Sequence, residues 1–205
     1  GYTTIGIAKT DEEMNNHLAK VDQSTIGNEW AAGDIMYADL DGDGEINGGQ
    51  GMLGKMGDKR IIGNKTPRYN FGLTLDASWQ GFDISAFFQG TMKRDLWLGD
   101  NQFWGASTMW QGIGLKAHED YFRLANDPMG ENLNSYYPRP IFDSEKNRQV
   151  QTRYLQSGAY IRLKNLQLGY TLPTEFMQKI AIQKLRVFIS GENLWTGTKM
   201  SKAFD

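Results

Sequence analysis

Three aspartates at alternate positions in a glycine-rich stretch are the residues of this sequence best suited to bind a metal ion. Asp39, Asp41 and Asp43 are followed by Gly44 and Glu45. An EF-hand calcium loop needs oxygen ligands at positions 1, 3 and 5, a glycine at position 6 and a backbone carbonyl at position 7. Three carboxylates at this spacing repel one another unless a cation lies among them. The stretch therefore predicts Ca²⁺ bound by Asp39, Asp41, Asp43 and Glu45; the alternative is a solvated acidic turn.

The acid that closes such a loop at position 12 is replaced here. Gln50 stands at that position, and an amide is a poor substitute for a bidentate carboxylate. Asp58 comes eight residues later, after the glycine-rich residues 48–57, and we expect it to return and close the site. The flanking residues lack the long amphipathic helices of a sensor EF-hand, so the ion is expected to brace a loop rather than to act as a switch.

The elements that must position this loop are indicated by strand-like alternation. Apolar residues occupy every second position over 71–79, and the alternation resumes over 82–89 after Gln80-Gly81, with Phe87 as a break in the polar face. Strict period-two alternation predicts strands with one apolar and one polar face. Two strands of about 10 residues joined by a short turn fit an outer-membrane barrel. They also fit a hairpin in a soluble β-sandwich, so the alternation alone leaves both folds open.

Further elements are expected on both sides of this hairpin. Residues 154–172 have strand character with a change of phase that indicates a β-bulge, and residues 185–192 form a last strand. A short helix is expected over 174–180, and a capping box of Thr10 and Glu13 begins another near the start of the chain. Connections at one end of the strands are short and those at the other end are long, as in outer-membrane barrels. The predicted fold class is all-β: antiparallel strands of a partial transmembrane β-barrel, with long extracellular loops and short helices.

Composition excludes several classes of function. The 205 residues carry a formal net charge of -2, which gives no electrostatic case for nucleic-acid binding. The chain has no cysteine, so disulfides and thiolate sites are excluded. No run of about 18 apolar residues occurs, so no transmembrane helix is expected. Neither His17 nor His118 belongs to a serine–histidine–aspartate arrangement, and we expect that the protein is not an enzyme.

A long aromatic segment, residues 95–150, lacks sustained periodicity. Segments of this length without regular structure are typically functional or disordered, and the aromatic content argues against disorder. Sugar rings have apolar faces that stack on indole rings, so Trp97, Trp104 and Trp110 are candidate substrate-binding residues. The alternative is that these rings only pack the loops together, as aromatic side chains mostly do.

Several sequence blocks are typical of one membrane-protein family. The blocks are GDI at 33–35, DLDGDGEI at 39–46, DKRIIGN at 58–64, GFDISAFFQG at 81–90, RYL at 153–155, GAYIRLKNLQLGYTLP at 158–173 and LRVFISGENL at 185–194. In these blocks the chain resembles the SusC/RagA-like TonB-dependent outer-membrane transporters. Where that family reads straight from the acidic loop to its closing aspartate, this chain has the insertion at 48–57.

The resemblance implies a role in nutrient import. Such a transporter has an amino-terminal plug inside a barrel of about 22 strands, acts through TonB, and is capped from outside by a SusD-like lipoprotein. The chain is expected to be the carboxy-terminal portion of such a barrel in the cell outer membrane, with TonB bound through a plug that these residues lack. Because four strands cannot close a barrel, we expect these residues to be part of a larger assembly or, as an isolated fragment, to pair their strands between copies or to adopt a non-barrel packing. The cargo is expected to be oligosaccharide or peptide fragments; the sequence does not decide which.

The resemblance also assigns sides to the predicted elements. Residues 1–67 are expected to form an extracellular loop region with the calcium-type loop, and residues 68–205 the barrel strands with the long loop at 95–150. The apolar strand faces are expected to meet outer-membrane lipid, the polar faces to line the lumen, and Trp79, Phe82 and Tyr170 to lie at the periplasmic interface. The alternative function is a soluble, calcium-braced carbohydrate-binding β module, and the need for detergent discriminates the two.

Overall fold

The chain folds into two compact units, each built from separate parts of the sequence. A computed structural model describes residues 1–105, 108, 110, 112, 114–178 and 182–201. The first unit, called the loop unit below, comprises Gly1–Asn64 and Leu96–Gln156 together with Ser201. The second, called the strand unit, comprises Lys65–Asp95 and Ser157–Met200. Most of the long segment 95–150 therefore folds with the first 64 residues and not with the strands that flank it in sequence.

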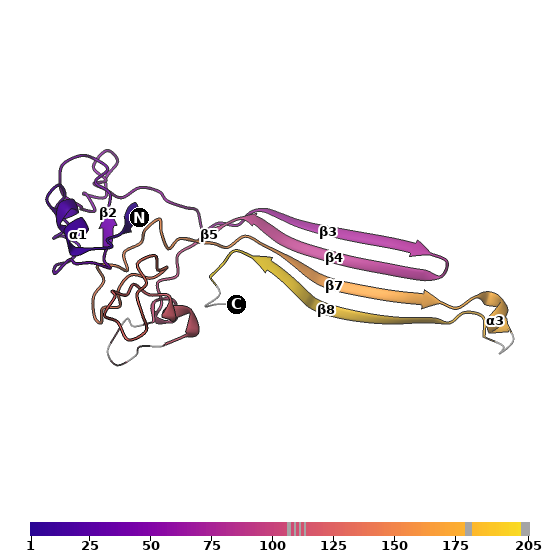
Figure 1. Cartoon of the computed structure of the whole chain (residues 1–205). Coiled ribbons are helices and arrows are strands. Elements are labelled where there is room, and N and C mark those ends of the chain that lie inside the picture. The colour runs from indigo at the N-terminus through magenta and orange to yellow at the C-terminus, as the bar shows by residue number, and fades with distance from the viewer. Residues whose placement is uncertain (106–107, 109, 111, 113, 179–181, 202–205) are drawn as a thin grey trace. The chain divides into compact units, whose positions relative to one another are not determined.

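Four long antiparallel strands form the sheet of the strand unit, in the order β3–β4–β7–β8 (Figure 1). They are β3 (Arg68–Trp79), β4 (Phe82–Lys93), β7 (Tyr160–Thr171) and β8 (Arg186–Thr198). Strands of 12 or 13 residues are long enough to cross a bilayer, which takes about 9–11 tilted residues. Among the described residues the sheet stays open, because β3 and β8 each have one outer edge without a neighbouring strand. The predicted fold class, antiparallel strands with a few short helices, is confirmed.

A two-residue turn closes the hairpin between β3 and β4. Gln80 and Gly81 both have positive φ, 48° and 88°, as a type I′ turn requires. A Cβ atom on Gly81 would lie 2.7 Å from the carbonyl oxygen of Thr171, so only glycine fits there. The register pairs Trp79 with Phe82 directly across the turn. The predicted hairpin and its turn are both confirmed.

The two faces of this sheet differ in chemistry. Directly paired residues point to the same face, so the register sorts the side chains into rows that run across the four strands. The apolar face carries the rows Leu73–Phe88–Leu163–Trp195, Leu75–Ala86–Leu166–Gly191, Ala77–Ile84–Leu168–Ile189 and Trp79–Phe82–Tyr170–Val187. The polar face carries the rows Asn70–Thr91–Tyr160–Thr198, Gly72–Gln89–Arg162–Thr196, Thr74–Phe87–Asn165–Glu192 and Asp76–Ser85–Gln167–Ser190.

The side chains of the apolar face are exposed rather than covered by a second layer. The exposed fraction is 52% for Leu75, 72% for Trp79 and 69% for Ile189. An exposed apolar surface that extends over four strands is rare on a soluble monomer. This sheet therefore does not form the inner wall of a closed soluble core.

A β-bulge in β7 keeps the apolar residues on one face. Phe87 of β4 pairs with Asn165 and Phe88 pairs with Leu163, so Lys164 has no partner in the ladder. One extra residue reverses the in–out alternation. As a result Leu163 before the bulge and Leu166 after it both point to the apolar face. The bulge predicted from the change of phase is confirmed.

The loop unit contains one strand pair and short helices. Strand β1 (Thr4–Ile7) pairs with β2 (Ile35–Tyr37). The other elements are α1 (Asp11–Leu18), α2 (Asn101–Trp104) and the 3₁₀ helix η1 (Lys116–Glu119). The short strands β5 (Asp95–Leu96) and β6 (Gln156–Ser157) lie where the sequence passes between the units, and α3 (Thr174–Gln178) connects β7 to β8. Ile180, at which the sequence placed the end of this last helix, lies outside the described residues. Within the described part of the chain, no helix is both long and apolar enough to span a membrane.

The capping box predicted for α1 is half right. The Thr10 hydroxyl accepts a hydrogen bond from the backbone N–H of Glu13 at 3.1 Å, as expected. The Glu13 carboxylate accepts the N–H of Lys9 at 2.6 Å and not that of Thr10. The acid thus satisfies a donor one residue before the cap, and the helix start still has two side chain–backbone bonds.

Aromatic rings fill the core of the loop unit. Its buried residues are Tyr2, Ile35, Tyr37, Ile46, Phe103, Trp104, Tyr137 and Tyr154. Trp104 and Tyr154 meet edge to face with ring centroids 4.8 Å apart, a preferred aromatic geometry. Burial raises the pKa of Tyr137 to about 12, so its phenol stays neutral at physiological pH. The aromatic content of 95–150 is therefore used largely to build this core.

A buried ion cluster ties the two halves of the loop unit together. The carboxylate of Asp34, which is fully buried, accepts two hydrogen bonds of 2.7 Å from Arg139. Lys146 lies 2.9 Å from the same carboxylate, and the amide of Asn147 donates to it at 2.8 Å. Burial by itself opposes ionisation of Asp34, but the bonds from Arg139, Asn147 and Lys146 outweigh it and lower the pKa below the ordinary aspartate value.

Candidate functional site

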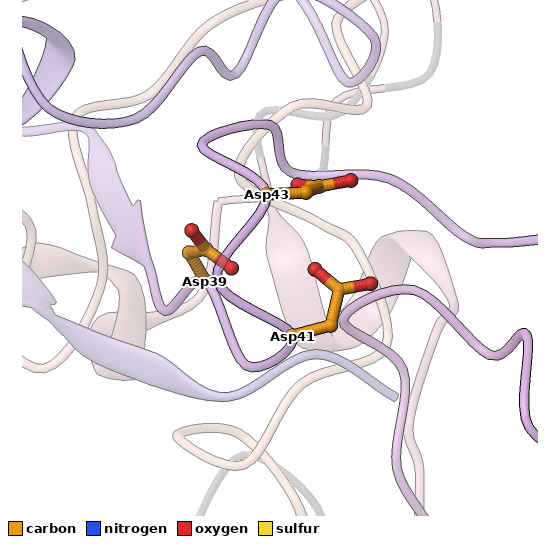
Figure 2. A group of neighbouring side chains, drawn as sticks. All are labelled: Asp39, Asp41 and Asp43. Carbon is orange, nitrogen blue, oxygen red and sulfur yellow. The ribbon is translucent and has the colours of Figure 1, made fainter.

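Three of the predicted ligands face one another on the acidic loop. Carboxylate oxygens of Asp39, Asp41 and Asp43 lie within 4.8 Å of each other, and all three side chains come from one turn of the chain (Figure 2). The Asp39 carboxylate accepts the backbone N–H groups of Gly42 at 2.6 Å and Gly44 at 2.9 Å. These bonds from the first ligand position fold the backbone around the acids, so the loop has its shape without an ion.

The carboxyl-terminal half of the loop is anchored in the core. Asp22 donates its N–H to the carbonyl of Gly44 at 2.8 Å and accepts the N–H of Ile46 at 2.7 Å. Both groups point to residue 22, so in this extended stretch the carbonyl of Glu45 points the other way. Ile46 itself is fully buried among the core aromatic rings. The loop is thus fixed at the position that a calcium loop uses for its backbone ligand.

Asp58 returns to the loop, as the sequence predicted, but its contacts are with the backbone. The side chain is fully buried, and its two oxygens accept the N–H groups of Leu40 at 2.7 Å and Asn47 at 2.8 Å. Asp58 is not one of the three acids that converge within 4.8 Å. Asp58, which follows the insertion at 48–57, thus binds the loop at both of its ends. Each of its carboxylate oxygens keeps a second lone pair.

Two carboxylates of the acidic loop have shifted pKa values. Two backbone N–H groups, from Gly42 and Gly44, lower the pKa of Asp39. At Asp41 the pKa is raised, first by desolvation and then by the charges of Asp43 and Asp58. The acids therefore oppose each other's ionisation, which a cation among them would relieve.

The donor set fits a hard divalent cation. Calcium takes 6–8 oxygen ligands at 2.3–2.6 Å, so two oxygens on one ion lie at most about 5 Å apart. The 4.8 Å spread of the three carboxylates is within that limit. Oxygen-only ligands suit Ca²⁺ or Mg²⁺ rather than zinc or copper. Loop geometry and ligand chemistry are both compatible with Ca²⁺.

The three candidate tryptophans lie in different environments. Trp104 is only 8% exposed and packs against Phe103 and Tyr154 in the core. Trp97 is partly buried, with its ring centroid 6.0 Å from that of Trp104. Trp110 is 92% exposed. The ring of Trp104 thus packs the loops, and Trp110 is the most exposed of the three.

Sequence reasoning passed over two features of the loop unit. One is the cluster in which Asp34 meets Arg139 and Lys146, both more than 100 residues later in the sequence. The other is a cavity along residues 137–148. The sequence signal for the second was the repeated proline in Pro138-Arg139-Pro140, which indicates an extended, rigid segment.

Comparison with known proteins finds curated relatives over most of the chain. No model of a protein family matches the chain. The curated TonB-dependent receptor P3 of Formosa agariphila is 31% identical over 175 residues, which cover 85% of this chain and 16% of the receptor. The chain is related to the TonB-dependent receptors. TonB-dependent receptor P26 of the same organism is 25% identical over 203 residues, or 95% of this chain and 17% of that receptor.

A solved structure has a similar fold. A solved structure of the RagAB peptide transporter covers 97% of this chain and 19% of its own matched chain, with a TM-score of 0.59 and 22% identity. At this identity the likeness shows the fold alone. The resemblance inferred from the sequence blocks is confirmed. The chain spans about a sixth of the length of the TonB-dependent receptors that it matches.

Proposed function

We propose that this chain forms part of the wall and outer loops of a TonB-dependent transporter in the outer membrane. The observation that carries the proposal is the four-stranded sheet with one exposed apolar face and one polar face. In a transmembrane barrel the apolar face meets lipid and the polar face lines the lumen. The match to TonB-dependent receptors over 85% of the chain supports the same assignment.

The two ends of the sheet indicate how the strands are oriented in the membrane. The row Trp79–Phe82–Tyr170 lies beside the two-residue turn, and the rings of Phe82 and Tyr170 are 4.4 Å apart. Aromatic rings favour the membrane–water interface, and short turns are typical of the periplasmic side. The turn end is therefore proposed as periplasmic and the loop unit as extracellular. The exposed apolar face speaks against the alternative of a soluble carbohydrate-binding module.

The proposed activity is import of oligosaccharide or peptide fragments, with a SusD-like lipoprotein as the outer partner and TonB bound through a plug domain. The similarity to a curated TonB-dependent receptor supports this class of activity. The test is disruption of the encoding gene in its host, followed by uptake of fluorescent oligosaccharides and oligopeptides. Loss of uptake of one cargo class, recovery by the intact gene, and purification of the protein from detergent-solubilised membranes with a lipoprotein are expected. A protein that is extracted in buffer without detergent contradicts the proposal.

We also propose that the acidic loop binds Ca²⁺. Carboxylates of Asp39, Asp41 and Asp43 and the carbonyl of Glu45 would hold the ion, and Asp58 would close the site from the side of Leu40 and Asn47. The convergence of three carboxylates within 4.8 Å supports this. When bound, the ion would supply charge neutralisation and cross-link the loop; the chain's own bonds already position the ligands.

Calcium is expected to stabilise the loop in the intact protein. Millimolar Ca²⁺ should slow amide exchange over residues 39–47, and free ion at 100 times its dissociation constant contributes about 2.7 kcal/mol. Asp41→Asn should abolish the effect, while the matched control Asp76→Asn, an exposed aspartate on the strand unit, should leave it intact. Hydrogen exchange followed by mass spectrometry is the measurement. Equal exchange with and without Ca²⁺ in the unaltered protein would end the proposal.

A further inference from the structure

A cavity of about 350 Å³ lies in the loop unit, and the acidic loop contributes no residue to it. One wall is the segment from Tyr137 to Phe142, and Trp104, His118 and Tyr121 complete the aromatic lining. The volume falls in the range of about 300–1,000 Å³ that is typical of small-molecule sites. The cavity is therefore large enough for one bulky side chain of a ligand with its neighbouring backbone.

The main wall offers apolar surface and few hydrogen bonds. Pro138 and Pro140 have no N–H group. The N–H groups of the residues that precede the two prolines are already used, because Tyr137 donates to the carbonyl of Asp120 and Arg139 to that of Gly33, both at 2.9 Å. A sugar buried here would leave hydroxyl groups without partners, and each such group is costly to bury. The wall favours an apolar group over a carbohydrate ring.

The charge around the cavity is positive. Among the lining residues, Arg139 and Arg148 carry full charges and no lining residue is acidic. Arg139 and Lys146 share the carboxylate of Asp34, and the charges of Asp11 and Glu29 also act on Arg139. Arg148 pairs with Glu145, whose side chain is 73% exposed, so solvent weakens this competing contact. Arg148 is therefore the lining cation best able to meet a carboxylate at the cavity.

One buried donor at the cavity lacks an acceptor. The indole nitrogen of Trp104 has no hydrogen-bond partner among the described residues, and the side chain is 8% exposed. Buried polar groups in native proteins nearly always have a partner, so such an atom calls for an explanation. A carbonyl or carboxylate oxygen of a ligand in the cavity is an acceptor of the required kind.

We propose that this cavity binds the carboxyl-terminal residue of a peptide, with an aromatic or aliphatic side chain inside and the carboxylate toward Arg148. The inference rests on the proposed transporter function and narrows its cargo to peptides. The apolar wall selects the side chain, and charge-assisted hydrogen bonds to a guanidinium group select the free carboxylate. The proline-rich wall disfavours a glycan at this site.

Isothermal titration of the intact protein in detergent tests the site with four probes. They are the tripeptide Ala-Ala-Phe, the same tripeptide with a carboxyl-terminal amide, Ala-Ala-Ala, and maltotriose. Ala-Ala-Phe is expected to bind at least about 10-fold more tightly than the amide, which lacks the carboxylate, and than Ala-Ala-Ala, which lacks a large apolar side chain. No binding of maltotriose is expected. Equal binding of acid and amide, or binding of maltotriose in place of the peptide, overturns the proposal.

Variants locate the binding within the protein. Ile141→Trp fills the cavity and should weaken binding of Ala-Ala-Phe at least about 10-fold. Its matched control, Ile61→Trp, alters a 90%-exposed isoleucine outside the cavity and should bind as the unaltered protein does. Arg148→Gln should remove the preference for acid over amide while leaving the preference for phenylalanine. Equal loss in both tryptophan variants, or a preference for acid that survives in Arg148→Gln, contradicts the assignment.

The experiments distinguish failure of the cavity proposal from failure of the transporter proposal. The titration needs neither a membrane nor TonB, so it reports on the cavity even if the protein imports nothing. Conversely, loss of uptake on gene disruption together with unchanged peptide binding in Ile141→Trp refutes the cavity and leaves transport standing.

Discussion

Replacement of Asp34 by asparagine is expected to speed amide exchange in the loop unit by at least about 100-fold. Asp34 is fully buried and is the one carboxylate that Arg139 and Lys146 share. Removal of one partner from a buried ion pair typically costs about 3–5 kcal/mol, because the remaining charge is left without compensation. Each 1.4 kcal/mol of opening free energy changes exchange about tenfold. Hydrogen exchange of peptides that cover residues 31–37 and 139–147 in the intact protein is the measurement.

Glu145→Gln is the control for this variant. It removes another ion pair of the same unit, with Arg148, but the Glu145 side chain is 73% exposed. Exposed pairs contribute about 0–1 kcal/mol, so exchange should rise less than about 5-fold. If the two variants raised exchange equally, burial of Asp34 would not be the reason that its ion pairs stabilise the loop unit.

The cluster also gives the loop unit a defined pH dependence. The pKa of Asp34 is lowered in the folded protein, so its contribution is present above the unfolded value of about 3.9 and is lost as pH falls through the folded value. Opening of the loop unit should therefore become easier on acidification below about pH 4. Asp34→Asn should lack this part of the pH dependence, and an unchanged acid limb would contradict the assignment.

Arginine in place of Leu73 is expected to lower the amount of folded protein in the outer membrane strongly. Leu73 lies midway along β3 on the apolar face, in the row with Phe88 and Leu163. A charged side chain on the lipid face of a barrel at mid-depth costs about 2–4 kcal/mol. The measurement is the fraction of heat-modifiable, folded protein in isolated outer membranes on electrophoresis with and without boiling.

The neighbouring residue supplies the matched control. Thr74 points to the opposite face, in a row with Asn165 and Glu192, where an added arginine meets polar partners and lumen water. Thr74→Arg should therefore accumulate almost as the unaltered protein does. The reverse order, with Thr74→Arg depleted and Leu73→Arg normal, would exchange the lipid and lumen faces and refute the proposed orientation.

The strand unit was predictable in detail because its information is local. Alternation over 71–79 and 82–89 predicted the faces, Gln80-Gly81 predicted the turn, and the change of phase in 154–172 predicted the bulge at Lys164. Each of these signals comes from residues that are neighbours in the chain, since side-chain direction alternates with every residue of a strand. The capping-box prediction was half right. The Thr10 contact is local and was predicted, but the Glu13 carboxylate accepts the N–H of Lys9 in place of the adjacent N–H of Thr10.

The convergence of the acids on the loop was predictable, and the contacts of Asp58 were less so. The EF-hand spacing indicated Asp39, Asp41 and Asp43, which converge. Asp58 does return, but the sequence did not reveal that its oxygens bind the backbone of Leu40 and Asn47. The contacts of Asp58 depend on the path of the insertion at 48–57. Glycine-rich segments have little hydrophobic pattern, so the sequence does not predict that path.

The sequence by itself determined which residues share a strand face, where the chain turns and which acids gather on one loop, because hydrogen-bond ladders and short turns depend on residues close together along the chain. Tertiary structure alone decided that Trp104 is buried, that Asp34 joins Arg139 and Lys146, and that residues 137–148 border a cavity. These features arise where segments distant in sequence meet, from about 30 residues apart at Trp104 and Tyr137 to more than 100 at Asp34 and Arg139. No periodicity in the chain records such a meeting. Burial and charge pairing follow from it, so they became visible only once the loop unit was assembled.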